Sequence, residues 1–161
     1  EEIKQIIFSA AVSSEAYAIK RVSFFSGKKI RYGDWSADKV VRLFRRLATI
    51  RFTPSMVHEH LIGYQRLATL KQVIFHNTMK DMSQVLMKLE SYSSYGAQLA
   101  YQQHKKSSLL KAIGHSFWCF IRGYLLRLGF LDGREGFILA ISNALGVFYR
   151  YVKLIYLYEL G

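Results

Sequence analysis

Apolar and polar residues alternate in short runs through the first half of the chain, a pattern typical of strands separated by turns. A branched and aromatic run at 17–25 returns at 28–32 after Ser26-Gly27, and this spacing predicts a hairpin. Before it, apolar residues at helical spacing within 1–10 predict the end of a helix packed on a sheet. Further short strands are expected at 40–44, 50–52 and 70–75, the last one ending at His76.

The second half of the chain changes to a repeat of about 3.6 residues, which predicts helices. A first helix is expected to begin after Asp81, which would act as its N-cap, and to end near His104. A second helix is expected over 109–128. A third is expected to start at Asp132, as its cap, and to reach Tyr158.

Composition narrows the class of protein. With 161 residues, of which 51% are apolar, the chain is long enough for a core, and global disorder is excluded. The net charge of +12 favours an anionic partner: nucleic acid, acidic lipid or a phosphorylated substrate. The single cysteine, Cys119, excludes an internal disulfide and a thiolate-rich zinc site. The first residue is Glu1 rather than Met, which favours a fragment or a processed chain.

Aromatic and basic residues gather toward the C-terminus, which favours a membrane interface over DNA. The apolar uncharged run 137–149, the segment nearest to a membrane span, is shorter than the roughly 20 residues that a span needs. Helices lying in the interface of an anionic leaflet are therefore expected. The cations that would face this leaflet are Arg122, Arg127, Arg134, Arg150 and Lys153. The alternative is an ordinary helical hairpin that buries its apolar face in its own core.

Two residues beside apolar runs are candidates for chemistry. Glu59 follows Met56-Val57-His58, and a carboxylate placed there could accept a proton from a sugar hydroxyl. Its alternative is a solvated surface charge. His76 could coordinate Mn²⁺ or a similar ion, although no carboxylate pair stands close to it and a lone histidine is more often structural.

Three arginines could bind a diphosphate, because the guanidinium fork matches phosphate oxygens. On a strand, Arg42 and Arg46 share one face whereas Arg45 points to the other. The alternative is a basic edge that discourages strand pairing. No glycine-rich phosphate loop, Ser-His-Asp pattern or His-Glu-x-x-His zinc motif is present.

Four stretches together resemble the second half of the catalytic domain in the lipopolysaccharide core group of family 2 glycosyltransferases. The most specific runs from Gly33-Asp34-Trp35 through Arg42-Leu43-Phe44-Arg45-Arg46. Val57-His58-Glu59 follows, and then Phe75-His76 with the helix start at Lys80. The last is Tyr124-Leu125-Leu126-Arg127-Leu128-Gly129-Phe130-Leu131-Asp132-Gly133-Arg134-Glu135-Gly136-Phe137.

The resemblance implies an inverting, single-displacement transfer of a sugar from a nucleotide-sugar donor to a lipid-linked saccharide. It assigns Glu59 as the general base and His76 as a ligand of Mn²⁺ or Mg²⁺ in the complete enzyme. It places four residues near the donor diphosphate or the acceptor, namely Trp35, Asp38, Arg42 and Arg45. The Asp-x-Asp motif of such enzymes is absent from the chain, Ala37 stands where proline is frequent, and Asn77 stands where an aromatic residue is common.

The expected fold is therefore an α+β fragment. Residues 1–79 would be the C-terminal half of a nucleotide-sugar-binding, GT-A-like α/β catalytic domain, and 80–161 a helical, basic-aromatic, membrane-associated region. The expected location is the cytoplasmic face of a bacterial inner membrane, as a peripheral protein that is inactive alone. One rival is a non-catalytic basic membrane-binding module. A nucleic-acid partner is not expected, because the aromatics lie in apolar helical runs rather than on a stacking platform.

Overall fold

The computed structural model describes residues 1–8, 14–36, 38–53 and 60–160. The chain forms two compact units that are interleaved along the sequence. The sheet unit comprises Glu1–Val22 and Ala37–His76, and the helical unit comprises Ser23–Ser36 and Asn77–Gly161. The helical unit thus includes, besides the C-terminal helices, the segment Ser23–Ser36 from the strand-rich part of the chain.

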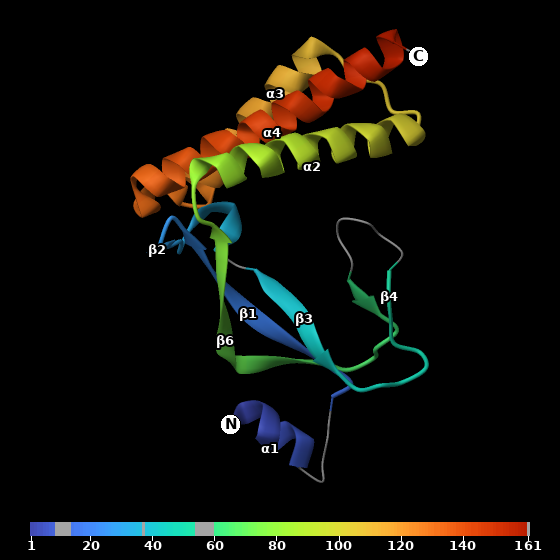
Figure 1. Cartoon of the computed structure of the whole chain (residues 1–161), viewed down its shortest axis with the longest axis vertical. Coiled ribbons are helices and arrows are strands. Elements are labelled where there is room, and N and C mark those ends of the chain that lie inside the picture. The colour runs from blue at the N-terminus through green and yellow to red at the C-terminus, as the bar shows by residue number, and fades with distance from the viewer. Residues whose placement is uncertain (9–13, 37, 54–59, 161) are drawn as a thin grey trace. The chain divides into compact units, whose positions relative to one another are not determined.

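The sheet unit is built on β1 (Ala16–Phe25), whose first part pairs antiparallel with β3 (Lys39–Phe44). β6 (Leu67–Met79) also pairs with β1 (Figure 1). The remaining elements are α1 (Glu2–Phe8) and a separate antiparallel pair formed by β4 (Arg51–Phe52) and β5 (Leu61–Ile62). The core of this unit is small, and it consists of Tyr17, Ile19 and Leu70 with Ile6, Leu43 and Ala68 packed against them.

The predicted strands and the N-terminal helix are confirmed, with one correction. The expected strand 70–75 is part of the longer β6, so His76 lies inside a strand and does not end one. Thr78, a β-branched residue, and Met79, a buried one, continue the extended backbone beyond it.

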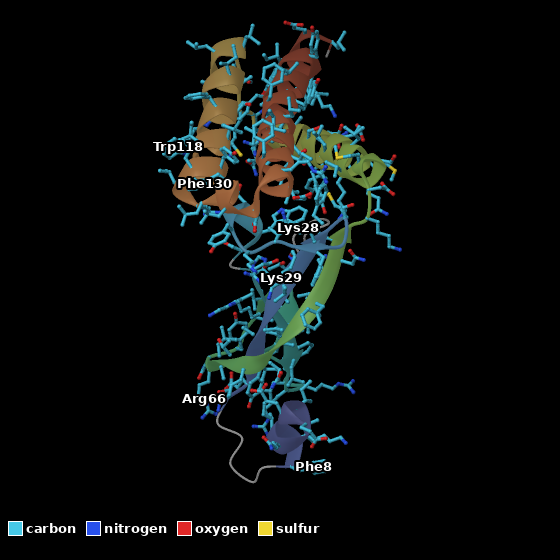
Figure 2. The ribbon with its side chains drawn as sticks, turned by 90° about the vertical axis from the view of Figure 1, so that its left-hand side faces the viewer. Phe8, Lys28, Lys29, Arg66, Trp118 and Phe130 are labelled. Carbon is cyan, nitrogen blue, oxygen red and sulfur yellow. The ribbon has the colours of Figure 1, made fainter. Side chains whose placement is uncertain are left out.

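The helical unit begins with the predicted hairpin, in which the end of β1 pairs with β2 (Lys28–Lys29). Both turn residues, Ser26 and Gly27, have positive φ angles of 46° and 79°, the conformation of a type I′ turn. Figure 2 labels the two lysines of β2 beside the helices of the same unit.

Three long helices make up most of the helical unit, and α4 packs against the other two (Figure 1). They are α2 (Met82–Gln102), α3 (Leu109–Ile121) and α4 (Arg134–Glu159). Three short helical segments complete the unit. η1 (Gly33–Trp35) follows the hairpin, whereas the π-helical η2 (Arg122–Leu126) and η3 (Gly129–Asp132) lie between α3 and α4 and contact η1. The core that joins hairpin and helices contains Phe25, Ile30, Met79, Val85 and Leu139, with Trp35 and Ile138 packed against it.

The helix boundaries confirm the periodicity analysis in most places. Asp81 is the N-cap of α2, because its Oδ1 accepts a hydrogen bond from the backbone N–H of Gln84 at 2.9 Å. The helix predicted over 109–128 ends as an α-helix at Ile121 and continues as the π-helical η2. The prediction that Asp132 caps the third helix was wrong. No side chain caps α4, which begins after Gly133, and the Asp132 carboxylate is engaged elsewhere.

Candidate functional site

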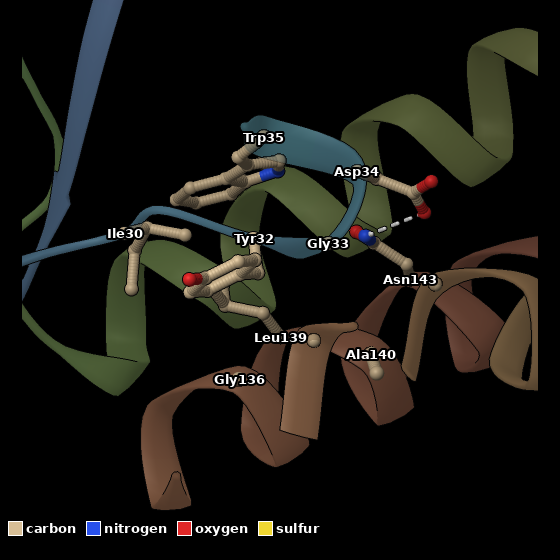
Figure 3. Close-up of a pocket in the computed structure, with 11 residues that line it drawn as sticks. Ile30, Tyr32, Gly33, Asp34, Trp35, Gly136, Leu139, Ala140 and Asn143 are labelled. Atoms are coloured by element: carbon tan, nitrogen blue, oxygen red, sulfur yellow. Dashed lines mark hydrogen bonds between the residues drawn. The ribbon is translucent and has the colours of Figure 1, made fainter. Parts of the chain in front are cut away.

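Two stretches that carry the family resemblance meet inside the helical unit. The loop 31–36, which follows the hairpin, contacts the segment 122–136, which links α3 to α4. The backbone N–H of Gly33 donates to the carbonyl oxygen of Arg127 at 2.9 Å. Residues about a hundred positions apart in the sequence therefore form one local structure (Figure 3).

Asp34 is the charged centre of this structure. Its side chain is only 15% exposed, and Arg127 Nη1 donates to its Oδ1 at 2.5 Å. Arg122 Nη2 lies 3.4 Å from the same oxygen, and Asn143 Nδ2 lies 3.5 Å from Oδ2 (Figure 3). Two guanidinium groups thus compensate one carboxylate, which is how a largely buried charge is tolerated.

Asp132 fixes the backbone of the loop from the other side. The residue is 5% exposed, and its Oδ2 accepts the backbone N–H of Tyr32 at 2.8 Å and that of Arg31 at 3.0 Å. Lys28 Nζ donates to the carbonyl oxygen of Asp132 at 2.8 Å. The carboxylate therefore satisfies two backbone donors of the loop that would otherwise lack a partner.

Glu135 adds an ion pair at the start of α4. Lys28 Nζ donates to its Oε2 at 2.7 Å, and Arg134 donates to its Oε1 at 3.1 Å. Chiefly through the Lys28 hydrogen bond, and then through a backbone N–H, the pKa of Glu135 falls to about 2. This carboxylate is ionised at neutral pH and is matched to a structural role rather than to proton transfer.

The close approach of η3 to α4 depends on glycine. A Cβ atom added at Gly136 would lie 1.9 Å from the carbonyl oxygen of Gly129, which no real contact allows. A Cβ added at Gly129 would lie 2.6 Å from the carbonyl oxygen of Gly123. Backbone packs directly on backbone here, and this holds Asp132 against the loop.

A small hollow opens beside this network. Its cavity volume is about 10 Å³, room for about one water molecule and far below the roughly 300–1,000 Å³ of a typical ligand pocket. Tyr32, Asp34 and Asn143 supply its polar atoms, whereas Trp35 and Leu139 supply its apolar wall (Figure 3). A hollow of this size does not accommodate a nucleotide sugar.

Burial also changes the pKa of the single cysteine of the chain. Cys119 on α3 is buried, and desolvation followed by the negative charge of Asp34 raises the pKa of its thiol. The thiol is therefore protonated at neutral pH, which is the state of an inert core cysteine rather than of a nucleophile.

The residues predicted from the sequence fall into different places. Trp35 is partly buried against the core of the helical unit and lines the hollow. Asp38 belongs to the sheet unit, where it forms an ion pair with Arg21. Arg42 lies exposed on β3, and Arg45 follows that strand, with its backbone N–H donating to the carbonyl oxygen of Glu15 at 2.8 Å.

Of the proposed base and the proposed metal ligand, the structure describes only the second. Glu59 lies outside the described residues, and its role remains a prediction. His76 is half-buried on β6. Among the described residues, no three His, Cys, Asp or Glu side chains gather to hold a metal ion, and one imidazole does not make a site for Mn²⁺ or Mg²⁺. The role of His76 as a ligand of Mn²⁺ or Mg²⁺ in the complete enzyme therefore stays a prediction.

Both stretches were identified from the sequence through the resemblance, but the contacts of Asp34 and Asp132 that join them were not predicted. A usable signal was present. Asp132 and Glu135 are the only carboxylates between residues 91 and 158, and they stand among three glycines at 129, 133 and 136. Few carboxylates in a basic region are candidates for pairing with cations, although local sequence predicted Asp132 as a helix cap.

The chain is similar to proteins named as glycosyltransferases. It is 26% identical over 147 residues to an uncharacterized glycosyltransferase of Rickettsia prowazekii, and 25% identical over 147 residues to one of Rickettsia typhi. Each match covers 86% of this chain and 50% of the relative, so the chain spans about half the length of these proteins. A third relative, from Rickettsia bellii, is 27% identical over 89 residues, which are 55% of this chain and 30% of that protein. No family model matches the chain, and no solved structure matches it.

Proposed function

We propose that this chain is the C-terminal portion of an inverting family 2 glycosyltransferase of the lipopolysaccharide core type. The complete enzyme would transfer a sugar from a nucleotide-sugar donor to a lipid-linked saccharide. The similarity to proteins named glycosyltransferase, over most of this chain and half of theirs, supports the sugar-transfer class and the reading as a portion. A further part of the enzyme would bind the nucleotide, so this chain alone would be inactive.

The observation that carries the proposal is the meeting of loop 31–36 with segment 122–136. Each stretch resembles the family separately, and the hydrogen bonds from Arg127 to Asp34 and from Tyr32 to Asp132 make them one element. We take this element as a rigid support beside the acceptor, with Trp35 as its apolar wall.

The chemistry of the proposed reaction assigns the remaining residues. An acceptor hydroxyl attacks the anomeric carbon, the bond to the nucleoside diphosphate breaks, and the leaving group departs with the electron pair. The hydroxyl proton passes to a carboxylate, for which we propose Glu59. Asp34 is unsuited to this task because two arginines already compensate its charge. The exposed Arg42 and Arg45 are proposed to bind the donor diphosphate or the acceptor.

We place the enzyme at the cytoplasmic face of a bacterial inner membrane. Of the helices that the structure describes, α4 is the one whose length and composition would allow it to cross a membrane. Long apolar helices of soluble proteins meet the same criterion, so peripheral attachment through the helical unit remains our proposal.

The test is sugar transfer by a longer protein that contains this chain. Glu59→Gln is expected to lower turnover by about 10²–10⁴-fold, the usual contribution of a general base, and to leave donor binding unchanged. Turnover is measured as release of nucleoside diphosphate in the presence of a lipid-linked acceptor. Glu90→Gln, which removes an exposed carboxylate on α2, is the matched control and should keep full turnover. Unchanged turnover in Glu59→Gln would remove that residue from the mechanism.

One observation favours a second function, a non-catalytic module that binds membranes. The outer face of α3 exposes a row of large apolar side chains. Vesicle binding by the longer protein, with no turnover of any nucleotide sugar, would favour this module over the enzyme.

A further inference from the structure

α3 has one face that is packed against α4. Ala112 and Cys119 are buried on that face. Ser116 Oγ donates to the carbonyl oxygen of Ala144 at 3.0 Å, and the His115 ring stacks on Tyr151 with centroids 4.8 Å apart. These contacts fix which side of α3 points away from the helical unit.

The opposite face of α3 is apolar and exposed. Its residues recur at helical spacing, and their exposed fractions are 81% for Leu110, 52% for Ile113, 67% for Phe117 and 54% for Trp118. We call these four residues the apolar α3 face. Figure 2 shows Trp118 on the outer side of the helices, and the exposed Phe130 of η3 is labelled near it. A contiguous apolar surface of this kind marks a binding surface.

The segment that contains this face carries only positive charges. Between residues 105 and 131 the chain carries five cations and no carboxylate. Three of the cations, Lys105, Lys106 and Lys111, are exposed, and none forms an ion pair with a residue that the structure describes. Arg122 and Arg127 contact Asp34 instead. An anionic partner is therefore favoured at the lysines.

The structure also changes which cations are available to a lipid surface. Lys153, which the sequence suggested for this role, donates to Ser93 and Ser94 of α2 at 2.9 and 2.6 Å. Arg134 contacts Glu135, and Arg150 lies over the Tyr151 ring. The exposed lysines just before α3 and in its first turn take over this role.

We propose that the apolar α3 face, flanked by Lys105, Lys106 and Lys111, inserts into the boundary between headgroups and acyl chains of an anionic bilayer. An apolar row with lysines beside it and a tryptophan within it is the composition of a helix lying in the interface. A second copy of the chain is disfavoured as the occupant, because it would bring these lysines against one another. The inference deepens the membrane location proposed above and is independent of sugar transfer.

The first test is sedimentation of the longer protein that contains this chain with vesicles of phosphatidylcholine that contain phosphatidylglycerol. The double variant Leu110→Gln/Phe117→Gln is expected to bind at least about tenfold more weakly, because two apolar side chains no longer leave water. Leu86→Gln/Met87→Gln removes two similarly exposed apolar side chains from α2, and it is the matched control that should bind like the unmodified chain. Thermal unfolding of both variants verifies that they are folded.

The second test separates the charges from the apolar face. Replacing Lys105 and Lys106 with glutamine should weaken binding to anionic vesicles by about fivefold for each lysine removed. Binding to vesicles of phosphatidylcholine alone should be weak and should not respond to these two changes. An equal effect on both vesicle types would contradict the electrostatic part of the proposal.

The third test reports on depth. Emission from Trp118 should be quenched by lipids that carry bromine on their acyl chains. This contribution to the quenching should disappear in Trp118→Phe, in which Trp35 is the remaining tryptophan of this chain. Equal vesicle binding by Leu110→Gln/Phe117→Gln and the unmodified chain would overturn the proposal. So would self-association that the same variant abolishes, since the face would then be covered by a second copy. Failure of these vesicle tests leaves the turnover test of Glu59 untouched.

Discussion

The two compact units hold their predicted functional residues in contrasting ways. In the helical unit, Asp34 and Asp132 connect the loop after the hairpin to the start of α4 through short hydrogen bonds. In the sheet unit, Arg42 and Arg45 are exposed, on and just after β3. The helical unit thus presents a preorganised structure, whereas this part of the sheet unit presents side chains without a surrounding site.

The sheet unit also exposes large apolar side chains along one strand. Along β6, Leu67, Val73, Ile74 and Phe75 are exposed, and the core of this unit is small. The described pairings of β1 with β2 and β3 are antiparallel, and the solvated face of an antiparallel sheet is normally polar. Under the proposed function, the nucleotide-binding part of the enzyme would cover these side chains. Among the described residues, the helical unit thus has a connected network of polar contacts, whereas the sheet unit exposes large apolar side chains along β6.

The sharpest way to break the contrast is to disrupt the backbone contact between η3 and α4. Gly136→Ala should destabilise the helical unit by about 3 kcal/mol or more, because the new methyl group cannot fit beside the carbonyl oxygen of Gly129. Hydrogen exchange should show lost protection in α4 and little change in β3.

Gly114→Ala is the control for that change. A Cβ atom at Gly114 on α3 would meet nothing within 4 Å, and alanine is the better helix former. This variant should be more stable than the unmodified chain by up to about 1 kcal/mol. Equal effects of the two substitutions would contradict the close packing described for Gly136.

Removing the carboxylate of Asp132 tests how strongly the loop is held. Asp132→Ala should cost about 2–3 kcal/mol, because the backbone N–H groups of Arg31 and Tyr32 lose their acceptor in a buried place. Asp81→Ala removes only the exposed N-cap of α2 and should cost about 1 kcal/mol. Denaturant unfolding measures both, and a smaller loss for Asp132→Ala would show that the loop is held by other contacts.

A double-mutant cycle sharpens the role of Asp34. Asp34→Asn and Arg127→Gln should couple by about 1 kcal/mol in the free energy of unfolding, since the pair is close but the arginine is half exposed. Arg46→Gln, combined with Asp34→Asn, serves as the uncoupled reference. Coupling near zero for the Arg127 pair would mean that the short contact adds no stability.

The smallest expected effect is a pH dependence that comes from Glu135. Its pKa lies near 2 in the folded chain and near 4.5 when unfolded, so the unfolded state binds more protons as the pH falls between these values. The stability contributed by the pair with Lys28 is present above about pH 4.5 and is lost toward pH 2. The melting temperature of Glu135→Gln should accordingly decrease less steeply than that of the unmodified chain as the pH is lowered from about 4.5 to about 2. Parallel curves would contradict the ion pair.

Local patterns predicted the elements well. The helices α2, α3 and α4 follow from apolar spacing, and the Asp81 cap and the Ser26-Gly27 turn follow from short-range chemistry. The role of Asp132 could not be predicted in this way, because its partner Tyr32 lies 100 residues away. Local reading assigned the carboxylate to the nearest helix, whereas two distant backbone donors take it.

The candidate site was predicted only in part, for the same reason. Trp35 was predicted through the resemblance, and it lines a hollow. The contacts of Asp34 with Arg122 and Asn143 could not be predicted, because they form only when the loop after the hairpin packs against the helices. The Ser116 side of α3 packs against Ala144 of α4, so the apolar α3 face on the opposite side is exposed. The spacing of apolar residues in the sequence does not show which side of α3 is packed and which is exposed.

Transfer of an isotopically labelled sugar by a longer protein that contains this chain tests the central claim most directly. The label is expected to join a lipid-linked saccharide with inverted anomeric configuration, and Glu59→Gln is expected to form almost no product while still binding the donor. Product with retained configuration, or equal labelling by Glu59→Gln, would contradict the claim.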